Sequence, residues 1–151
     1  MIDRPTAWRA TILVALTALV MFSFLGSARL WDRDEPRNAR ASQEMLERHD
    51  WIVPTFNGQL RTHKPILLYW LQMSAYACFG QGEFTARLPS ALSAFVSVMA
   101  LAWLAGRLAG ERTLLGPNGF WSGAVLATCT LFVMSGRAAT PDACLIACST
   151  L

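Results

Sequence analysis

Residues 65–82 read PILLYWLQMSAYACFGQG, and the fold depends on whether this segment crosses a membrane or lies on its surface. The segment is apolar enough to cross, but it contains Tyr69, Trp70, Gln72 and Tyr76 and runs only about seventeen residues before the charge at Glu83. Aromatic rings and polar groups in such an apolar segment suit a helix among the lipid headgroups. We therefore predict an interfacial helix over about 65–80.

Apolar and charged segments alternate along the rest of the chain. Of its 151 residues, 54% are hydrophobic and 15% are charged, which is too apolar for an ordinary soluble domain. Apolar runs predict membrane-spanning helices at about 9–29, 87–107 and 118–136, and a last one that begins near 141. The charged, helix-favouring segment 36–48 predicts a second interfacial helix. The predicted fold class is all-α, a multi-span membrane protein with two juxtamembrane interfacial helices.

The two ends of the chain each leave an alternative. The first apolar run could be a signal peptide with Gly26-Ser27-Ala28 as the cleavage site, but its length favours an uncleaved span. The last nine residues, Ala143 to Leu151, are uncharged and carry no helix-stop signal. We expect residues 1–151 to be the N-terminal part of a longer protein.

A cluster of charges, Asp32-Arg33-Asp34-Glu35-Pro36-Arg37, follows the first apolar run directly. Crowded carboxylates raise one another's pKa and attract cations, so the cluster is a candidate general base or metal site. The alternative is a solvated loop that starts a helix, with the arginines neutralising the acids. Farther along, Asn57-Gly58 predicts a tight turn that returns Arg61, His63 and Lys64 toward the cluster.

The path of residues 65–82 decides which residues share a compartment. If the segment lies in the interface, then Asp34, Lys64 and Asp142 face the same side; if it crosses, Asp142 lies opposite Asp34. Thr140-Pro141-Asp142 predicts a helix start, with the carboxylate in the first turn. Taken alone, this position explains Asp142 without a catalytic role.

Two features exclude other classes of function. A net charge of +3 that is spread along the chain gives no case for nucleic-acid binding. The four cysteines lie in apolar runs without a C-x-x-C pair, and so we expect buried small hydrophobic residues rather than metal ligands or disulfides.

An ordered series of motifs resembles the integral-membrane glycosyltransferases of the C type, including bacterial aminoarabinose transferases and proteins similar to dolichyl-phosphate-mannose-protein mannosyltransferases. The series covers the chain from about Leu30 to its end. Its members are Asp34-Glu35-Pro36-Arg37, Glu44-Met45-Leu46, Asp50-Trp51-Ile52-Val53-Pro54 with Asn57-Gly58, Lys64-Pro65 with Tyr69-Trp70-Leu71, Phe79-Gly80 with Glu83-Phe84, Ala86-Arg87-Leu88-Pro89-Ser90, and Gly136-Arg137-Ala138 with Asp142.

The resemblance implies a reaction and roles for particular residues. Such enzymes transfer a sugar, with inversion, from a polyprenyl-phosphate donor to an acceptor at the outer face of the cytoplasmic membrane. By matching position, Asp34 is the expected catalytic base, Asp142 the second acidic residue of the site, and Lys64 the contact to the donor phosphate. Arg37, Glu35 and Arg61 are the further candidate substrate-binding residues. Residues 1–151 would then be the N-terminal part of the transmembrane catalytic domain, in the inner membrane.

This chain differs from the family's pattern at the residue before the Lys-Pro pair. Relatives with aminoarabinose activity have Glu there, and it contributes to a metal site, whereas this chain has His63. Because imidazole also binds zinc, a divalent metal ion held by His63 is possible, and no other cofactor is expected.

Two other functions and one conflict remain open at this stage. A transporter or binding protein would need charges inside the spans, and the apolar runs have none. The chain could also be an inactive fragment, and we expect no activity from residues 1–151 alone. A plain positive-inside count places the acidic cluster in the cytoplasm, unless the excess cations on that side bind an anionic lipid.

Overall fold

A computed structural model describes residues 4–30, 33–113 and 115–151, and it leaves out the side chains of residues 4 and 5. Asp32 of the acidic cluster lies outside the described residues. Helices dominate the described part, as the all-α prediction requires, and a small hairpin joins two of them. The elements are α1 (Arg4–Phe22), α2 (Asp34–Glu47), β1 (Thr55–Phe56), β2 (Gln59–Leu60), α3 (Ile66–Phe79), α4 (Glu83–Leu108), α5 (Pro117–Thr128), α6 (Thr130–Arg137) and α7 (Asp142–Thr150).

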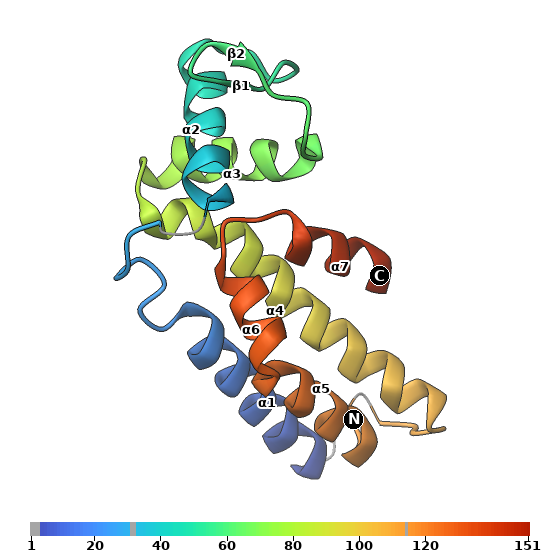
Figure 1. Ribbon diagram of the computed structural model, residues 1–151. Coiled ribbons are helices and arrows are strands. Elements are labelled where there is room, and N and C mark those ends of the chain that lie inside the picture. Colours follow the sequence, from blue (N-terminus) through green and yellow to red (C-terminus); the bar gives the residue numbers. More distant parts are fainter. Residues whose placement is uncertain (1–3, 31–32, 114) are drawn as a thin grey trace.

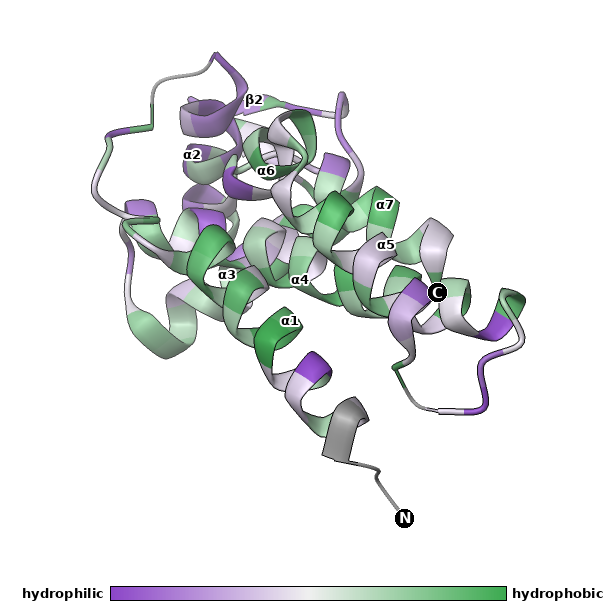
Figure 2. Cartoon of the chain, turned by 90° about the horizontal axis from the view of Figure 1, so that it is seen from below, coloured by the Kyte–Doolittle hydropathy of each residue, from purple (hydrophilic) through white to green (hydrophobic). Residues whose placement is uncertain are grey.

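The molecule consists of an elongated helical bundle with a cap at one end. Helices α1 and α4 and the pair α5–α6 run side by side along the bundle, while α2, α3 and the hairpin form the cap (Figure 1). Apolar residues line the bundle helices, as Figure 2 shows. The chain runs toward the cap along α1, away from it along α4 and back to it along α5–α6 (Figure 1). The segments that follow α1 and α6 therefore both begin at the cap.

Small residues allow the bundle helices to approach closely. A Cβ built on Gly119 of α5 would lie 2.5 Å from the carbonyl oxygen of Ala102 in α4, and one built on Gly123 would lie 2.8 Å from the Leu13 side chain in α1. Backbone contact of this kind is the packing that transmembrane helices use in place of a hydrophobic driving force.

The predicted interfacial segment forms the helix α3, but its polar residues have a different role from the one predicted. Tyr69, Gln72 and Tyr76 are buried in the cap, and Trp70 alone of the four polar or aromatic residues is exposed, at 42%. The Ser42 hydroxyl of α2 donates to Gln72 Oε1 at 2.6 Å, and Gln72 Nε2 donates to the Ala86 carbonyl of α4 at 2.8 Å. These residues therefore join three helices rather than face the headgroups.

Two predicted spans differ from the helices in the structure. The first was expected over 9–29, but α1 ends at Phe22, and Phe24 has a positive φ of 54°. Arg137 donates to the carbonyls of Val20 and Ser23, both at 2.6 Å, and so closes the end of α1 from another helix.

The second difference is a break at Cys129, where α5 and α6 meet at a bend of 65°. The Thr128 hydroxyl donates to the carbonyl of Ala124 at 2.9 Å and also to that of Val125 at 3.3 Å, the acceptor that the Cys129 amide would use in a continuous helix. That amide bonds Leu126 instead, at 3.1 Å. The predicted span 118–136 is thus two helices.

Length and composition limit which helices could cross a bilayer. Among the described residues, α4 is long and apolar enough to cross a membrane on its own. The bent pair α5–α6 is long enough if it counts as one span, whereas α1 and α3 are shorter apolar helices. The 14 residues of α3 extend about 21 Å, less than the hydrocarbon core of about 30 Å.

The prediction that the cysteines are buried holds for Cys144 alone. Cys78, Cys129 and Cys148 are exposed, and all four thiols are free. Apolar sequence around a cysteine does not decide whether it is buried: the Cys144 thiol accepts a hydrogen bond from Ser93 of α4, whereas Cys148, one turn later on the same face of α7, is exposed.

Candidate functional site

The candidate site is centred on an ion pair between Asp34 and Lys64. Lys64 Nζ lies 2.7 Å from Asp34 Oδ2, and the two side chains are 27% and 36% exposed, respectively. Asp34 is the first residue of α2, where a carboxylate also favours the positive end of the helix dipole. The structure thus brings together the candidate base and the candidate phosphate contact, which are thirty residues apart.

Neighbouring cations hold Asp34 in its charged form. The hydrogen bond from Lys64 lowers the pKa of Asp34 below its ordinary value of 3.8, and the charges of Lys64, Arg61 and Arg37 act in the same direction. Partial burial opposes this effect without reversing it. Asp34 is therefore a carboxylate at neutral pH, ready to accept a proton.

The hairpin between α2 and α3 is what returns Lys64 to Asp34. Asn57 and Gly58 both have positive φ, 53° and 75°, which gives the predicted tight turn between β1 and β2. The Glu44 carboxylate of α2 accepts hydrogen bonds from the Thr55 hydroxyl at 2.7 Å and from the amides of Asn57 and Gly58 at 2.8 and 3.3 Å. Glu44 thereby fixes the turn against the same helix that carries Asp34.

Arg61, on the same segment as Lys64, is half-buried and bonded within the cap. Its guanidinium donates to the Tyr69 hydroxyl at 3.2 Å and to Asn38 Oδ1 at 3.1 Å. Arg61 thus adds positive charge beside Asp34 while its position is fixed by α2 and α3.

Glu35 occupies a different environment from the one that a substrate-binding role predicts. It is 1% exposed and forms a two-pronged ion pair with Arg87 of α4, at 2.9 Å for each bond, and the Ala139 amide donates to Glu35 Oε1 at 2.8 Å. Arg87 also donates to the carbonyls of Leu25, Ala28 and Arg29 in the α1–α2 linker. Because helical spacing turns Glu35 away from Asp34, it joins α2 to the bundle.

A cavity of about 660 Å³ borders the Glu35–Arg87 pair on the side of α6. Its other walls include Phe24, Val133 and Met134. Any group entering this cavity would meet a carboxylate that is already neutralised by its partner.

Asp142 lies at the same end of the molecule, exposed in the first turn of α7. The loop before it contacts α2 through Ala139, whose amide bonds Glu35 and whose carbonyl accepts from Asn38 Nδ2 at 3.0 Å. The structure therefore places the loop that leads to Asp142 against the first turn of the helix that begins at Asp34.

A metal ion at the candidate site would need several ligands close to His63. His63 is exposed, and within the described ranges no group of three or more His, Cys, Asp and Glu side chains could hold a metal ion. A divalent metal ion held by His63 therefore stays a prediction.

Sequence reasoning assigned no role to Asn38, Glu44 or Arg87. The motif series contained Glu44 and Arg87, but nothing in the spacing pointed to their partners. Polar residues at positions 35, 38 and 42 recur along one side of α2, and that pattern is the signal that could have marked a buried polar face.

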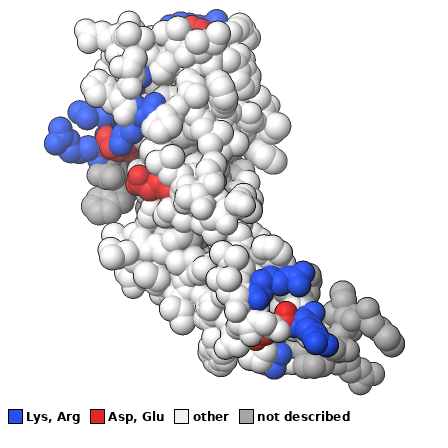
Figure 3. All heavy atoms as spheres, turned by 90° about the vertical axis from the view of Figure 1, so that its right-hand side faces the viewer, with Lys and Arg blue, Asp and Glu red and all other residues white. Residues whose placement is uncertain are grey.

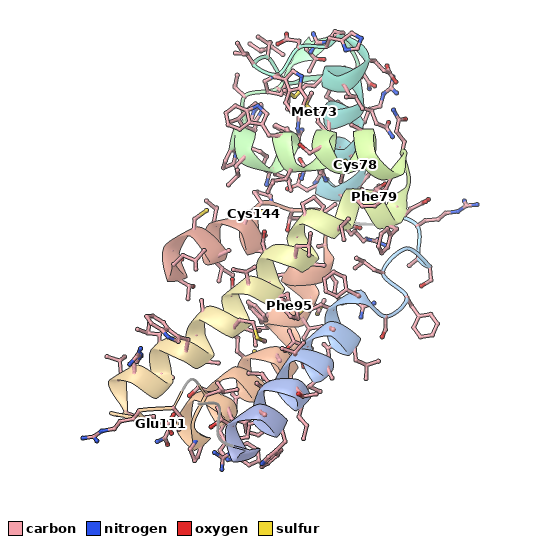
Figure 4. All side chains as sticks on the ribbon, turned by 180° about the vertical axis from the view of Figure 1, so that it is seen from behind. Met73, Cys78, Phe79, Phe95, Glu111 and Cys144 are labelled. Atoms are coloured by element: carbon pink, nitrogen blue, oxygen red, sulfur yellow. The ribbon has the colours of Figure 1, made fainter. Side chains whose placement is uncertain are left out.

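Charged residues gather at two levels of the molecule. On the face that Figure 3 shows, Lys, Arg, Asp and Glu lie at the cap and at the far end of the bundle, with a surface free of these residues between them. The candidate site lies at the cap, and Glu111 lies at the opposite end of α4 from Cys78 and Phe79 (Figure 4).

Comparison with known proteins identifies the family to which this chain belongs. Its residues 63–151 match the model of the dolichyl-phosphate-mannose-protein mannosyltransferase family, and the chain belongs to that family. This confirms the resemblance seen in the ordered motifs.

Relatives with similar sequences include aminoarabinose transferases. The chain is 34% identical over 139 residues to an undecaprenyl phosphate-alpha-4-amino-4-deoxy-L-arabinose arabinosyl transferase of Enterobacter sp. strain 638, a match that covers 92% of this chain and 24% of the relative. A second such transferase, from Sodalis glossinidius, is 35% identical over 86% of this chain and 22% of its own. The chain therefore spans about a quarter of the length of these relatives.

Solved structures agree with the sequence matches. The crystal structure of ArnT from Cupriavidus metallidurans bound to undecaprenyl phosphate has a TM-score of 0.84 and 28% identity, covering 96% of this chain and 26% of that one. The apo structure of the same protein gives a TM-score of 0.77. These neighbours favour a transferase and give no support to a transporter.

Proposed function

We propose that the full protein transfers a sugar from a polyprenyl-phosphate donor to an acceptor hydroxyl at the outer face of the cytoplasmic membrane, with inversion at the anomeric carbon. The observation that carries the proposal is the Asp34–Lys64 pair, a carboxylate and an ammonium 2.7 Å apart at the membrane end of α2. The transferase names of the relatives and the undecaprenyl phosphate bound to the similar ArnT structure support this class of donor.

Asp34 serves as the general base in this reaction. The acceptor hydroxyl gives its proton to the Asp34 carboxylate as its oxygen bonds to the anomeric carbon from the side opposite the phosphate. The bond between that carbon and the phosphate oxygen breaks, and the electron pair leaves with the polyprenyl phosphate. Asp142, on the first turn of α7, is the second acidic residue facing the reacting sugar.

Lys64 stabilises the leaving group. Negative charge on the phosphate grows as the bond breaks, so an ammonium held beside it lowers the energy of the transition state more than that of the ground state. Arg37 and Arg61 add to this positive field. When Lys64 turns to the phosphate, Asp34 loses its strongest stabilising contact and becomes a better base.

The polyprenyl tail follows an apolar groove of about 230 Å³ between α3 and α4. Leu71, Phe79 and Leu92 are among its lining residues, with Cys78 on the same wall. In this proposal α1, α4 and the α5–α6 pair cross the bilayer, and α2 and α3 lie at its outer surface. The short α3 and the charge-free surface in Figure 3 support that placement.

The excess of basic residues on the site's side has internal uses in this fold. Arg87 and Arg137 bind linker carbonyls, Arg61 binds Asn38 and Tyr69, and Arg48 binds the carbonyls of Glu44 and Val53. An outer-face position for the site therefore does not require that every cation there bind an anionic lipid.

The test is sugar transfer by the full-length protein in membranes, with a panel of polyprenyl-phosphate sugars as donors. Asp34→Asn should insert normally and lose transfer, while Asp50→Asn, the same change on the loop after α2, should remain active. Wild-type turnover by Asp34→Asn would overturn the assignment of the base.

A further inference from the structure

The first turn of α2 presents two different faces. Asp34 and Arg37 are half-buried on the side of the candidate site, whereas Glu35 and Asn38 are 1% and 0% exposed on the inner side. Residues three or four apart are neighbours on a helix, so Glu35 and Asn38 form one buried polar surface directly beside Asp34.

This surface holds both backbone groups of a single loop residue. The Ala139 amide donates to Glu35 at 2.8 Å, and the Ala139 carbonyl accepts from Asn38 Nδ2 at 3.0 Å. Ala139 comes three residues before Asp142, so the pair of bonds ties the start of α7 to α2, while the Ser90 hydroxyl ties the next residue, Thr140, to α4 at 3.0 Å.

The other end of the Asn38 amide binds the segment that carries Lys64. Asn38 Oδ1 accepts from Arg61 Nη2 at 3.1 Å. A guanidinium can only donate and a backbone carbonyl can only accept, so these two partners fix the orientation of the amide. Asn38 is thus the residue at which the segments of Asp34, Lys64 and Asp142 are joined.

We propose that Asn38 is a positioning residue that keeps the Asp142 loop and the Arg61–Lys64 segment at fixed places around Asp34. The proposal rests on the proposed transferase function for its effect on catalysis. A neutral amide suits the position because it donates to Ala139 and accepts from Arg61 without placing a second carboxylate beside Glu35. Leu has a similar shape and makes neither bond; Asp keeps the acceptor for Arg61 and loses the donor for Ala139.

The kinetic test uses Asn38→Leu and Asn38→Asp in the full-length protein. Misplacing catalytic groups by about 1 Å can cost about a hundredfold in rate, so we expect both variants to lower kcat by about 10- to 100-fold. Binding of undecaprenyl phosphate, measured by calorimetry, should weaken much less in Asn38→Asp, which keeps Arg61 in place. Gln43→Leu, on the same helix, is the control and should leave both quantities unchanged.

A second measurement reads the position of the loop without any need for activity. Spin labels at Glu47→Cys in α2 and Leu145→Cys in α7, with the native cysteines replaced, report the distance between the two helices. The distribution of distances between the two labels should be narrow in the otherwise unchanged protein and in Gln43→Leu. It should be broad or shifted in both Asn38 variants.

The two measurements separate the proposals from each other. Unchanged distances in both Asn38 variants, or a wild-type kcat in both, would overturn the positioning role. If Asp34→Asn were fully active while the distances still broadened, the assigned chemistry would fail and the joining of the segments by Asn38 would stand.

Discussion

At the scale of single residues, the pairing of Asp34 with Lys64 has two opposite effects in the proposed mechanism. The ammonium keeps Asp34 deprotonated, as a base must be, but a carboxylate whose pKa is lowered is also a weaker base. Competition between the donor phosphate and Asp34 for Lys64 resolves this conflict, because the base would be strengthened only when the donor is bound.

The pH dependence of kcat/KM follows from the lowered pKa of Asp34. In the free enzyme the carboxylate stays charged down to below its ordinary value of 3.8, so the acid limb of the profile should lie below that pH. Lys64→Gln removes the largest stabilising contact and raises the pKa of Asp34, which should move the acid limb to higher pH. Lys64→Arg keeps the charge and should leave the limb in place; an unmoved limb in Lys64→Gln would contradict this account of Asp34.

At the scale of elements, α2 organises the cap through polar contacts on its inner side. Asp34 and Glu35 lie at its start, Asn38 and Ser42 bind other segments, and Glu44 holds the hairpin. A helix of such low hydrophobicity gains its place in the fold from these specific bonds. Each bond that α2 makes also fixes the distance between Asp34 and the segment bound.

The hairpin depends on the charge of Glu44. Burial raises the pKa of Glu44, but hydrogen bonds from Thr55, Gly58 and Asn57 outweigh that effect and hold the pKa below 4.5. The stabilisation by this carboxylate is therefore present above its unfolded pKa and is lost as the pH falls through its folded pKa.

Substituting Glu44 should loosen the hairpin and the segment that leads to Lys64. Losing the charged acceptor costs about 1–3 kcal/mol, so in Glu44→Gln the amides of Asn57 and Gly58 should exchange hydrogen about 5- to 100-fold faster. Glu47→Gln, whose side chain is 54% exposed on the same helix, should leave these amides unchanged. Equal exchange in both variants would show that Glu44 does not hold the turn.

At the scale of the whole molecule, the direction of the bundle helices decides which loops meet. The chain reaches the cap at the end of α1, leaves it along α4 and returns along α5–α6 (Figure 1). The cap therefore receives the segments that carry Asp34, Lys64 and Asp142, and the loop with Glu111 and Arg112 lies at the far end. In the proposed membrane orientation, Asp34, Lys64 and Asp142 share one compartment.

Accessibility labelling of the full-length protein tests that arrangement. In a cysteine-free background, Asp34→Cys and Asp142→Cys should both react with an impermeant thiol reagent added outside the cytoplasmic membrane. Arg112→Cys, at the other end of the bundle, should react only after permeabilisation. Labelling of positions 34 and 142 from opposite sides would rule out a shared site.

Local pattern was enough to predict the helices of the cap and the turn between its strands. Apolar runs bounded by charge predicted α3 and, in the bundle, α4, and helix-favouring residues after Pro36 predicted α2. Asn57-Gly58 predicted the turn. Each of these signals lies within a few neighbouring residues, which is why local pattern was enough. The same pattern failed where a local hydroxyl or a distant side chain ended a helix, as Thr128 does in the α5–α6 pair and Arg137 does at the end of α1.

The sequence by itself determined that this chain is helical, apolar and similar in motif order to C-type glycosyltransferases, since composition, periodicity and motif order are all written along the chain. Only the tertiary structure decided that Glu35 binds Arg87, that Asn38 joins Ala139 to Arg61, and which of the basic residues returned by the turn pairs with Asp34. Those partners are many residues apart, and a hydrogen bond depends on distance and direction in space, which the packing of the bundle and the cap sets.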